Sequence, residues 1–333
     1  MLLTRARRQA MIAGALASVV MLGAAPPSTE DKKPDAQRSV EPSAIRAFYI
    51  GHSLNSDIPD MVASFACGGC AGGDAKSITF REQFIPGAPL RWQWGERDRD
   101  PAQRMKGDQF RVAWFDAFAT GAIDALVMVD SVPRDASMMP ETLGDAGRFA
   151  EAVAARNPKA RIYIYEPWHC LRSGTPEGCD HDRGENSRLK WRERIDREAP
   201  MWDELVAALA KRFPAPRPTL IPVGRALGAL ADEAAAGRIA GLDSIEDFFD
   251  DAIHPNPYGK YFIACVHYAV LTGRSPVGLT ADPKDRWGRS YWNTPNWQGK
   301  QWAPPDQKAV RAMQELAWRT GGSAKDQRPA PKR

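Results

Sequence analysis

Short apolar runs alternate with longer helical patterns along most of this chain, and this alternation limits the fold more than any other feature. The runs that predict strands are residues 45–50, 77–85, 124–132, 160–168 and 218–224. Apolar residues at helical spacing predict helices over residues 57–66, 143–157, 188–213, 226–239 and 256–273. This order of elements predicts a three-layer α/β/α sandwich with a central parallel sheet, whose active crevice lies at the carboxyl ends of the strands.

Several residues mark the expected helix boundaries. Asp57 is predicted to be the N-cap of the first helix, and Pro200 suggests a start or break within residues 188–213. The last core helix is bounded by Asn256 as N-cap, Pro257 in its first turn and Gly273 as its stop.

The N-terminus has the pattern of a secretory leader. Arg5, Arg7 and Arg8 precede an apolar run of 15 residues, 11–25, which ends in small residues. This pattern predicts a signal peptide over residues 1–25, and hence a periplasmic or secreted protein with no stable membrane insertion after cleavage. An uncleaved anchor is the alternative, although the run is short for a membrane span. No cysteine directly follows this apolar run, so a lipoprotein is not expected.

The rest of the chain divides by composition. Residues 26–44 and 321–333 are polar and proline-containing, which predicts a disordered linker and tail. Between them we expect a main domain over residues 45–275. A tryptophan-rich extension with a closing helix is expected over residues 276–320. The formal net charge of +4, from 45 basic and 41 acidic residues, does not indicate nucleic-acid binding.

The five cysteines suit an oxidising compartment. Cys67 and Cys70 are close in "CGGC", and Cys170 and Cys179 bound a short Gly/Pro-containing stretch, so two local disulfides are predicted. Cys265 lies in an apolar helical pattern and is expected to be a buried thiol. A zinc site on four thiols or a redox role for "CGGC" is the alternative.

A serine stands where the first strand ends and the first helix is about to begin. In "GHSL", Ser53 follows Gly51, which allows a sharp turn, so its hydroxyl is expected at the crevice, with its own N–H able to bind an anion. A nucleophilic serine needs a base. "DDAIHP" supplies one in His254, which Asp251 can orient from the same loop. The alternative is that Ser53 and His254 only cap helices. Asp250 could take the place of Asp251, but it lies one residue farther from the histidine.

These two segments resemble the first and last blocks of the SGNH/GDSL hydrolases, in the same order and at corresponding positions between strands and helices. The resemblance covers roughly residues 45–275. It implies a flavodoxin-like fold, ester cleavage by Ser53, His254 and Asp251, and oxyanion binding by the N–H groups of Ser53 and Gly87. Many members of the family remove acetyl groups from carbohydrates, and some relatives transfer them.

One block of the family is not matched. The family has an asparagine after the third strand, as a further oxyanion donor, whereas this chain has Asp130 and Ser131. His52 replaces the usual aspartate of the first block, and we assign it no catalytic role. His169 follows a strand end and competes for a site role, although a structural role beside a cystine is favoured.

Tryptophans supply the last candidates. Trp287, Trp292, Trp297 and Trp302 recur every five residues in a polar segment, which fits neither a strand nor a helix. They could complete the core, or one or more could form a platform for sugar rings beside Ser53. Trp168, with Glu166, lies at a strand end and is a candidate pocket residue; Trp287 and Trp292 are the other substrate-binding candidates.

The sequence therefore predicts an exported serine esterase that removes acyl groups, with O-acetyl groups of a carbohydrate as the expected substrate. It needs no metal and no organic cofactor. The expected partner is a small-molecule or polysaccharide ester. An O-acetyltransferase with the same triad and a non-catalytic carbohydrate-binding protein remain as alternatives.

Overall fold

The computed structural model describes residues 44–74, 77–180, 182, 184–296 and 298–322. The predicted leader, most of the predicted linker, nearly all of the predicted tail and Trp297 lie outside the described residues. Contacts divide the chain into units at residues 1–41 and 42–333, and every described residue belongs to the second.

Five parallel strands form the sheet, in the order β2-β1-β3-β4-β5. This is the flavodoxin-like order of doubly wound folds. The strands are β1 (Ile45–Gly51), β2 (Ile78–Phe84), β3 (Ala125–Met128), β4 (Arg161–Tyr165) and β5 (Thr219–Ile221). The order reverses between β1 and β3, so the crevice of such a fold is expected at the carboxyl end of β1, where Ser53 follows.

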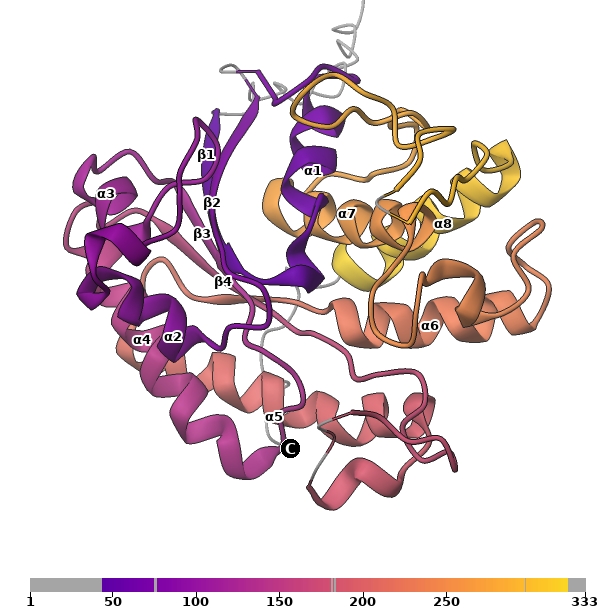
Figure 1. Ribbon diagram of the computed structural model, residues 1–333, viewed down its shortest axis with the longest axis horizontal. Coiled ribbons are helices and arrows are strands. Elements are labelled where there is room, and N and C mark those ends of the chain that lie inside the picture. The colour runs from indigo at the N-terminus through magenta and orange to yellow at the C-terminus, as the bar shows by residue number, and fades with distance from the viewer. Residues whose placement is uncertain (1–43, 75–76, 181, 183, 297, 323–333) are drawn as a thin grey trace, which may run out of the picture. The chain divides into compact units, whose positions relative to one another are not determined.

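Helices cover both faces of the sheet, which explains why β1 is apolar throughout. Ala47 and Tyr49 pack with α1, α6, α7 and α8, whereas Phe48 and Ile50 pack with α2, α3, α4 and the second half of α5. Figure 1 shows α1, α7 and α8 on one side of the sheet and α2, α3 and α4 on the other. The helices are α1 (Ile58–Ala66), α2 (Leu90–Gly95), α3 (Trp114–Ala119), α4 (Met139–Ala154), α5 (Trp191–Arg212), α6 (Val223–Ala235), α7 (Pro257–Thr272) and α8 (Gln307–Gly321). The predicted α/β/α sandwich is confirmed.

Of the boundary residues marked in the sequence, those of α7 are confirmed and two others are wrong, while α4 and α6 begin four and three residues before the predicted ranges. Asn256 caps α7 by accepting from the Tyr258 N–H, and Gly273, at φ 65°, ends it as predicted. Asp57 precedes α1 at φ 66° but makes no capping bond, because its carboxylate pairs with Lys260 at 2.7 Å. Helix α5 runs through Pro200 without a break, since that proline lies on the exposed side, where water can bind the carbonyl left unpaired.

The extension belongs to the same core as the sheet. Its described residues between α7 and α8 contain neither a helix nor a named strand, only an isolated bridge between Lys284 and Ser290. Helix α8 buries Val310, Met313 and Leu316 in the hydrophobic cluster that also contains α7. In the described part of the chain, no helix is both long enough and apolar enough to cross a bilayer.

Both predicted disulfides are present. Cys67 is bonded to Cys70 and Cys170 to Cys179, with Cα–Cα distances of 5.7 and 6.1 Å. Their four sulfurs are therefore not available as zinc ligands. Cys265 is a buried free thiol, as predicted.

Candidate active site

The turn after β1 presents Ser53 at the carboxyl end of the sheet. Ser53 begins a short 3-10 turn, Ser53–Asn55, directly before α1. A Cβ at Gly51 would lie 2.8 Å from Cγ1 of Val129 and 2.9 Å from Cβ of Asn55. Only glycine allows the strand, the turn and the neighbouring loop to approach this closely.

The structure brings Ser53, His254 and Asp251 into one hydrogen-bonded chain. Oγ of Ser53 lies 3.0 Å from Nε2 of His254, and Nδ1 of His254 lies 2.8 Å from Oδ2 of Asp251. If Nδ1 donates to the carboxylate, Nε2 is free to accept the hydroxyl proton. This is the geometry of a serine nucleophile with its base and the group that orients the base.

Asp251 holds its own loop as well as the imidazole. Its Oδ1 accepts from the backbone N–H groups of Ile253 and His254, both at 2.8 Å. Burial alone would raise the pKa of Asp251, but the hydrogen bonds from His254 and Ile253 outweigh it and lower the pKa below its ordinary value. The carboxylate therefore stays ionised, as a partner for an imidazolium must.

Two contacts from the segment after β4 fasten the triad loop. Nε1 of Trp168 donates to the Ile253 carbonyl at 2.9 Å, and the Leu171 N–H donates to the Ala252 carbonyl at 2.6 Å. Trp168 is fully buried, and its ring meets Phe249 edge to face. The expectation that Trp168 lines the substrate pocket is therefore wrong: it supports the loop that carries Asp251 and His254.

Two backbone N–H groups in the Ser53 pocket, those of Ser53 and Gly87, are the expected oxyanion donors. Gly87, at φ 65°, follows Pro86 in the turn after β2 and lines the same pocket as Ser53. Only glycine readily adopts this conformation after a proline in such a turn. Among the described residues, neither the Ser53 N–H nor the Gly87 N–H has a hydrogen-bond acceptor. Both donors are therefore available to a ligand.

Asp130 does not replace the missing asparagine. It is buried, and its carboxylate accepts from the Leu90 and Ser131 N–H groups, from Arg134 and from the Thr142 hydroxyl, at 2.7–3.0 Å. A carboxylate so bound is an acceptor and cannot donate to an oxyanion. Ser131 lines the pocket beside it.

His52 joins the nucleophile turn to the loop after β3. Its Nδ1 accepts from the Leu54 N–H, and its Nε2 lies 3.0 Å from the Asp130 carbonyl, so Nε2 carries the proton in this arrangement. Burial lowers the pKa of His52 and keeps the ring neutral. The neutral ring positions the turn, which agrees with giving His52 no catalytic role.

A pocket of about 520 Å³ opens over Ser53. One wall is the loop closed by the Cys170–Cys179 disulfide, which contributes Arg172 and Glu177. His169 also lines the pocket, but it is buried and paired with Glu198. This supports the structural role expected for His169. The described residues that line the pocket include no asparagine.

The extension contributes no ring to this pocket among its described tryptophans. Trp292 and Trp302 are 4% and 7% exposed, and Trp292 stacks on Tyr258 at 5.6 Å, so the expected substrate role of Trp292 is wrong. Trp287 is 57% exposed, but it lines a different pocket.

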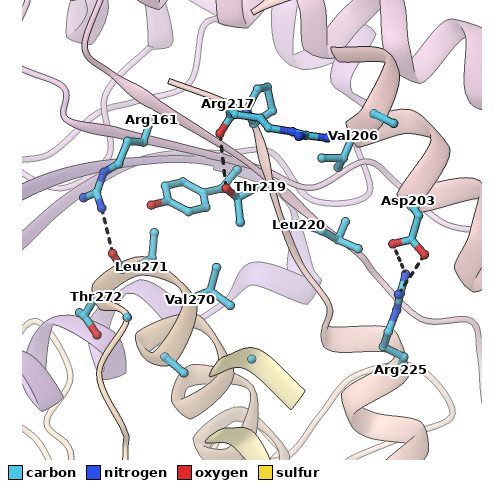
Figure 2. Close-up of a pocket in the computed structure, with 16 residues that line it drawn as sticks. Arg161, Asp203, Val206, Arg217, Thr219, Leu220, Arg225, Val270, Leu271 and Thr272 are labelled. Carbon is cyan, nitrogen blue, oxygen red and sulfur yellow. Dashed lines mark hydrogen bonds and ion pairs between the residues drawn. The ribbon is translucent and has the colours of Figure 1, made fainter. Parts of the chain in front are cut away.

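A larger cavity, of about 800 Å³, shares no lining residue with the Ser53 pocket, and Figure 2 shows the residues that line it. It is bounded by the beginnings of β4 and β5 and the end of α7, and Arg161 donates there to the Leu271 carbonyl at 3.1 Å. Arg225 pairs with Asp203 at its margin and with the buried Glu166 at 2.8 Å. Glu166 is therefore bound to a guanidinium and does not line the Ser53 pocket. Because this cavity lies toward the amino ends of the strands, we place the chemistry in the smaller pocket.

Comparisons with known proteins show a similarity of fold only. No family model and no curated protein matches the sequence. A solved structure of a DUF4886 family protein from Bacteroides uniformis is similar over 84% of this chain and 95% of its own, with a TM-score of 0.52 and 14% identity.

Two more distant structures have titles that name an activity. One is a putative GDSL-like lipase from Parabacteroides merdae, with a TM-score of 0.39 and 12% identity over 70% of this chain and 97% of its own. The other is a lipase/acylhydrolase from Enterococcus faecalis, with a TM-score of 0.41 and 12% identity over 69% of this chain and 96% of its own. Scores this low carry no argument about activity. The α/β/α fold implied by the SGNH/GDSL resemblance is nevertheless present, with Ser53 and His254 at the expected edge of the sheet.

Proposed function

We propose that this protein is a serine ester hydrolase in which Ser53 is the nucleophile, His254 the general base and Asp251 the residue that orients the base. The observation that carries the proposal is the continuous chain from Ser53 Oγ to Asp251 Oδ2, with links of 3.0 and 2.8 Å, at the edge of a pocket of about 520 Å³. A capping serine or a capping histidine would not need this alignment. The same chain favours an enzyme over a non-catalytic binding protein.

The reaction begins when Oγ of Ser53 attacks the ester carbonyl carbon. Its proton passes to Nε2 of His254, and the carboxylate of Asp251 stabilises the imidazolium that forms. The negative charge on the former carbonyl oxygen is held by the N–H groups of Ser53 and Gly87. When the intermediate collapses, His254 returns the proton to the leaving alcohol and the acyl group remains on Ser53.

A water molecule completes the cycle. His254 removes a proton from the water as its oxygen attacks the acyl carbon, and the second tetrahedral intermediate releases the acid and the Ser53 hydroxyl. Each proton that leaves an attacking oxygen is returned to a leaving oxygen, so the residues of the triad are regenerated. None of these steps uses a metal or an organic cofactor.

The proposed substrate is an acyl ester, with an O-acetyl group on a carbohydrate as the expected case. The resemblance to the SGNH/GDSL hydrolases supports this choice, since many members of that family remove acetyl groups from carbohydrates. Export is supported by the two disulfides, which persist in oxidising compartments.

Labelling with a fluorophosphonate tests the nucleophile. We expect mass spectrometry to find the label on the peptide that contains Ser53, and Ser53→Ala and His254→Ala each to abolish labelling and turnover of a small aryl acetate. Ser131 lines the same pocket, so Ser131→Ala is the matched control, in which Ser53 must still be labelled. Label on another residue, or wild-type turnover by Ser53→Ala, would refute the proposal. Product analysis with a glycan acceptor separates hydrolysis from acyl transfer.

A further inference from the structure

A second polar pocket, of about 240 Å³, lies beside the nucleophile turn on the β2 side of the sheet. It contains Ser56 and Asp57, which link that turn to α1, Phe84 from the end of β2 and Trp287 from the extension. It shares no lining residue with the Ser53 pocket. Ser56 follows Ser53 by three residues, so their Cα atoms are at most about 11 Å apart. One oligosaccharide could therefore occupy both pockets.

Trp287 is held in place by its neighbours although most of its surface is exposed. Its backbone N–H donates to Oδ1 of Asp285 at 2.9 Å, and its ring packs edge to face with Phe110 at 5.7 Å. The preceding residue, Arg286, is tied to Asp60 at 2.8 Å and to Glu82 at 2.7 Å. The ring is nevertheless 57% exposed. A large aromatic side chain that is fixed and exposed beside a polar pocket is suited to stacking on a ligand.

The polar groups around Trp287 suit hydroxyl groups. Glu82 lines the pocket and is 1% exposed, and its Oε2 has no hydrogen-bond partner among the described residues. A ligand hydroxyl could donate to such an acceptor, and nearby guanidinium groups could donate to the hydroxyl oxygen.

The balance of charge indicates which ligands the pocket disfavours. Its lining contains more carboxylates than guanidinium groups, namely Asp57, Asp60, Glu82, Asp108 and Asp285 against Arg111, Arg286 and Arg289. The excess of acidic groups disfavours an anionic ligand, so acidic sugars are expected to bind poorly.

We propose that this pocket is a subsite for an uncharged sugar ring, which stacks on Trp287 while a neighbouring ester of the same carbohydrate reaches Ser53. The proposal rests on the proposed function for its link to Ser53. The binding of sugar by the pocket can be measured without any turnover.

Calorimetry on the Ser53→Ala protein tests the subsite directly. The ligands are a panel of short O-acetylated oligosaccharides built from neutral hexoses or pentoses. We expect at least one of them to bind, and the Trp287→Ala change in the same background to raise its Kd about tenfold or more, a loss of about 1.4 kcal/mol. An oligosaccharide of uronic acids should bind more weakly than the neutral ones.

Trp92 provides a matched control. It is 59% exposed, on α2, and does not line the pocket. Trp92→Ala should therefore leave the Kd unchanged. The subsite is refuted if no neutral oligosaccharide binds, if Trp287→Ala leaves the Kd unchanged, if Trp92→Ala weakens binding equally, or if the uronic acid ligand binds as tightly as the neutral ones. Turnover of the aryl acetate by the wild-type enzyme, which needs no sugar subsite, tests the proposed function separately.

Discussion

Asp251 uses its two carboxylate oxygens for different tasks, one for the ring of His254 and the other for the backbone of the loop. An asparagine could keep the second task, because its Oδ1 still accepts from the Ile253 and His254 N–H groups. Its amide N–H₂ would then face Nδ1 of His254, which favours the wrong imidazole tautomer.

We therefore expect Asp251→Asn to lower kcat strongly, but roughly tenfold to a hundredfold less than His254→Ala does. Steady-state kinetics on an aryl acetate measures both variants, and circular dichroism checks that they are folded. Equal losses in the two variants would contradict the division of tasks.

His267 lies in α7, and neither of its ring nitrogens has a partner among the described residues. Burial lowers its pKa to about 3, below its ordinary value of 6.5. The unfolded chain therefore binds a proton that the folded chain does not, and stability falls as the pH decreases below 6.5. At pH 5 the loss is about 2 kcal/mol relative to neutral pH.

His267→Phe should remove this loss, since phenylalanine has no titrating group and can keep the ring contacts with Tyr49 and Tyr165. Urea unfolding at pH 7 and pH 5 measures the effect. An equal loss of stability between these pH values in the variant and the wild type would show that other groups are responsible.

The individual site residues differ in how well the sequence predicts them. Ser53, Asp251 and His254 are identifiable because each belongs to a local pattern whose spacing matters for the chemistry. The role of Trp168 is not identifiable in this way, because a tryptophan at a strand end can face a pocket or the core. Here its indole N–H donates to the carbonyl of Ile253, which is distant in the sequence. The partner of His52 is equally distant in sequence, at Asp130.

At the scale of the elements, the disulfide loop after β4 forms a wall of the pocket. Its bond joins cysteines nine positions apart, which corresponds to about 2–3 kcal/mol on the chain-entropy estimate. We expect Cys170→Ser with Cys179→Ser to lower stability by about this amount. KM for a large ester should rise more than KM for an aryl acetate, because the small substrate makes less use of the wall. Peptide mapping without reductant checks the bond in protein expressed in the periplasm; finding both thiols free would contradict it.

Trp168 connects the segment after β4 to the triad loop, so its loss should act through His254. We expect Trp168→Phe, which removes the hydrogen bond to Ile253 but keeps an aromatic ring, to lower kcat and the rate of fluorophosphonate labelling about fivefold to tenfold, as the loss of about 1 kcal/mol would. Trp191→Phe is the matched control. Trp191 is also buried, but its N–H donates to the His169 carbonyl. Equal losses of rate in both variants would indicate general destabilisation in place of positioning.

Elements with a clear apolar pattern were predictable, whereas short helices were not. The five strands and α4, α6 and α7 are marked by continuous apolar runs or clear helical spacing. Helices α2 and α3 have six residues each, too few to show a period. Asp57 fails as a cap because Lys260, far away in the sequence, binds its carboxylate.

At the scale of the whole molecule, α8 is part of the hydrophobic core and packs against α7. Burial of Val310, Met313 and Leu316 contributes about 1.5–3 kcal/mol for each side chain, a sum comparable with the total stability of many domains. We expect a chain that ends after Gly273 to be insoluble or to unfold without a cooperative transition, as followed by thermal melting. A soluble product that melts within a few degrees of the full chain would show that the extension is dispensable.

Ser53 and His254 are 201 positions apart in the sequence, one after the first strand and the other before α7. The sheet, α7 and the loops between them must all be complete before the hydroxyl meets the imidazole. A nascent or partly denatured chain can therefore contain every residue of the triad and still be inert. On the proposed function, turnover of a simple ester becomes an assay of native assembly, which could score refolding yields or variant libraries more directly than solubility does.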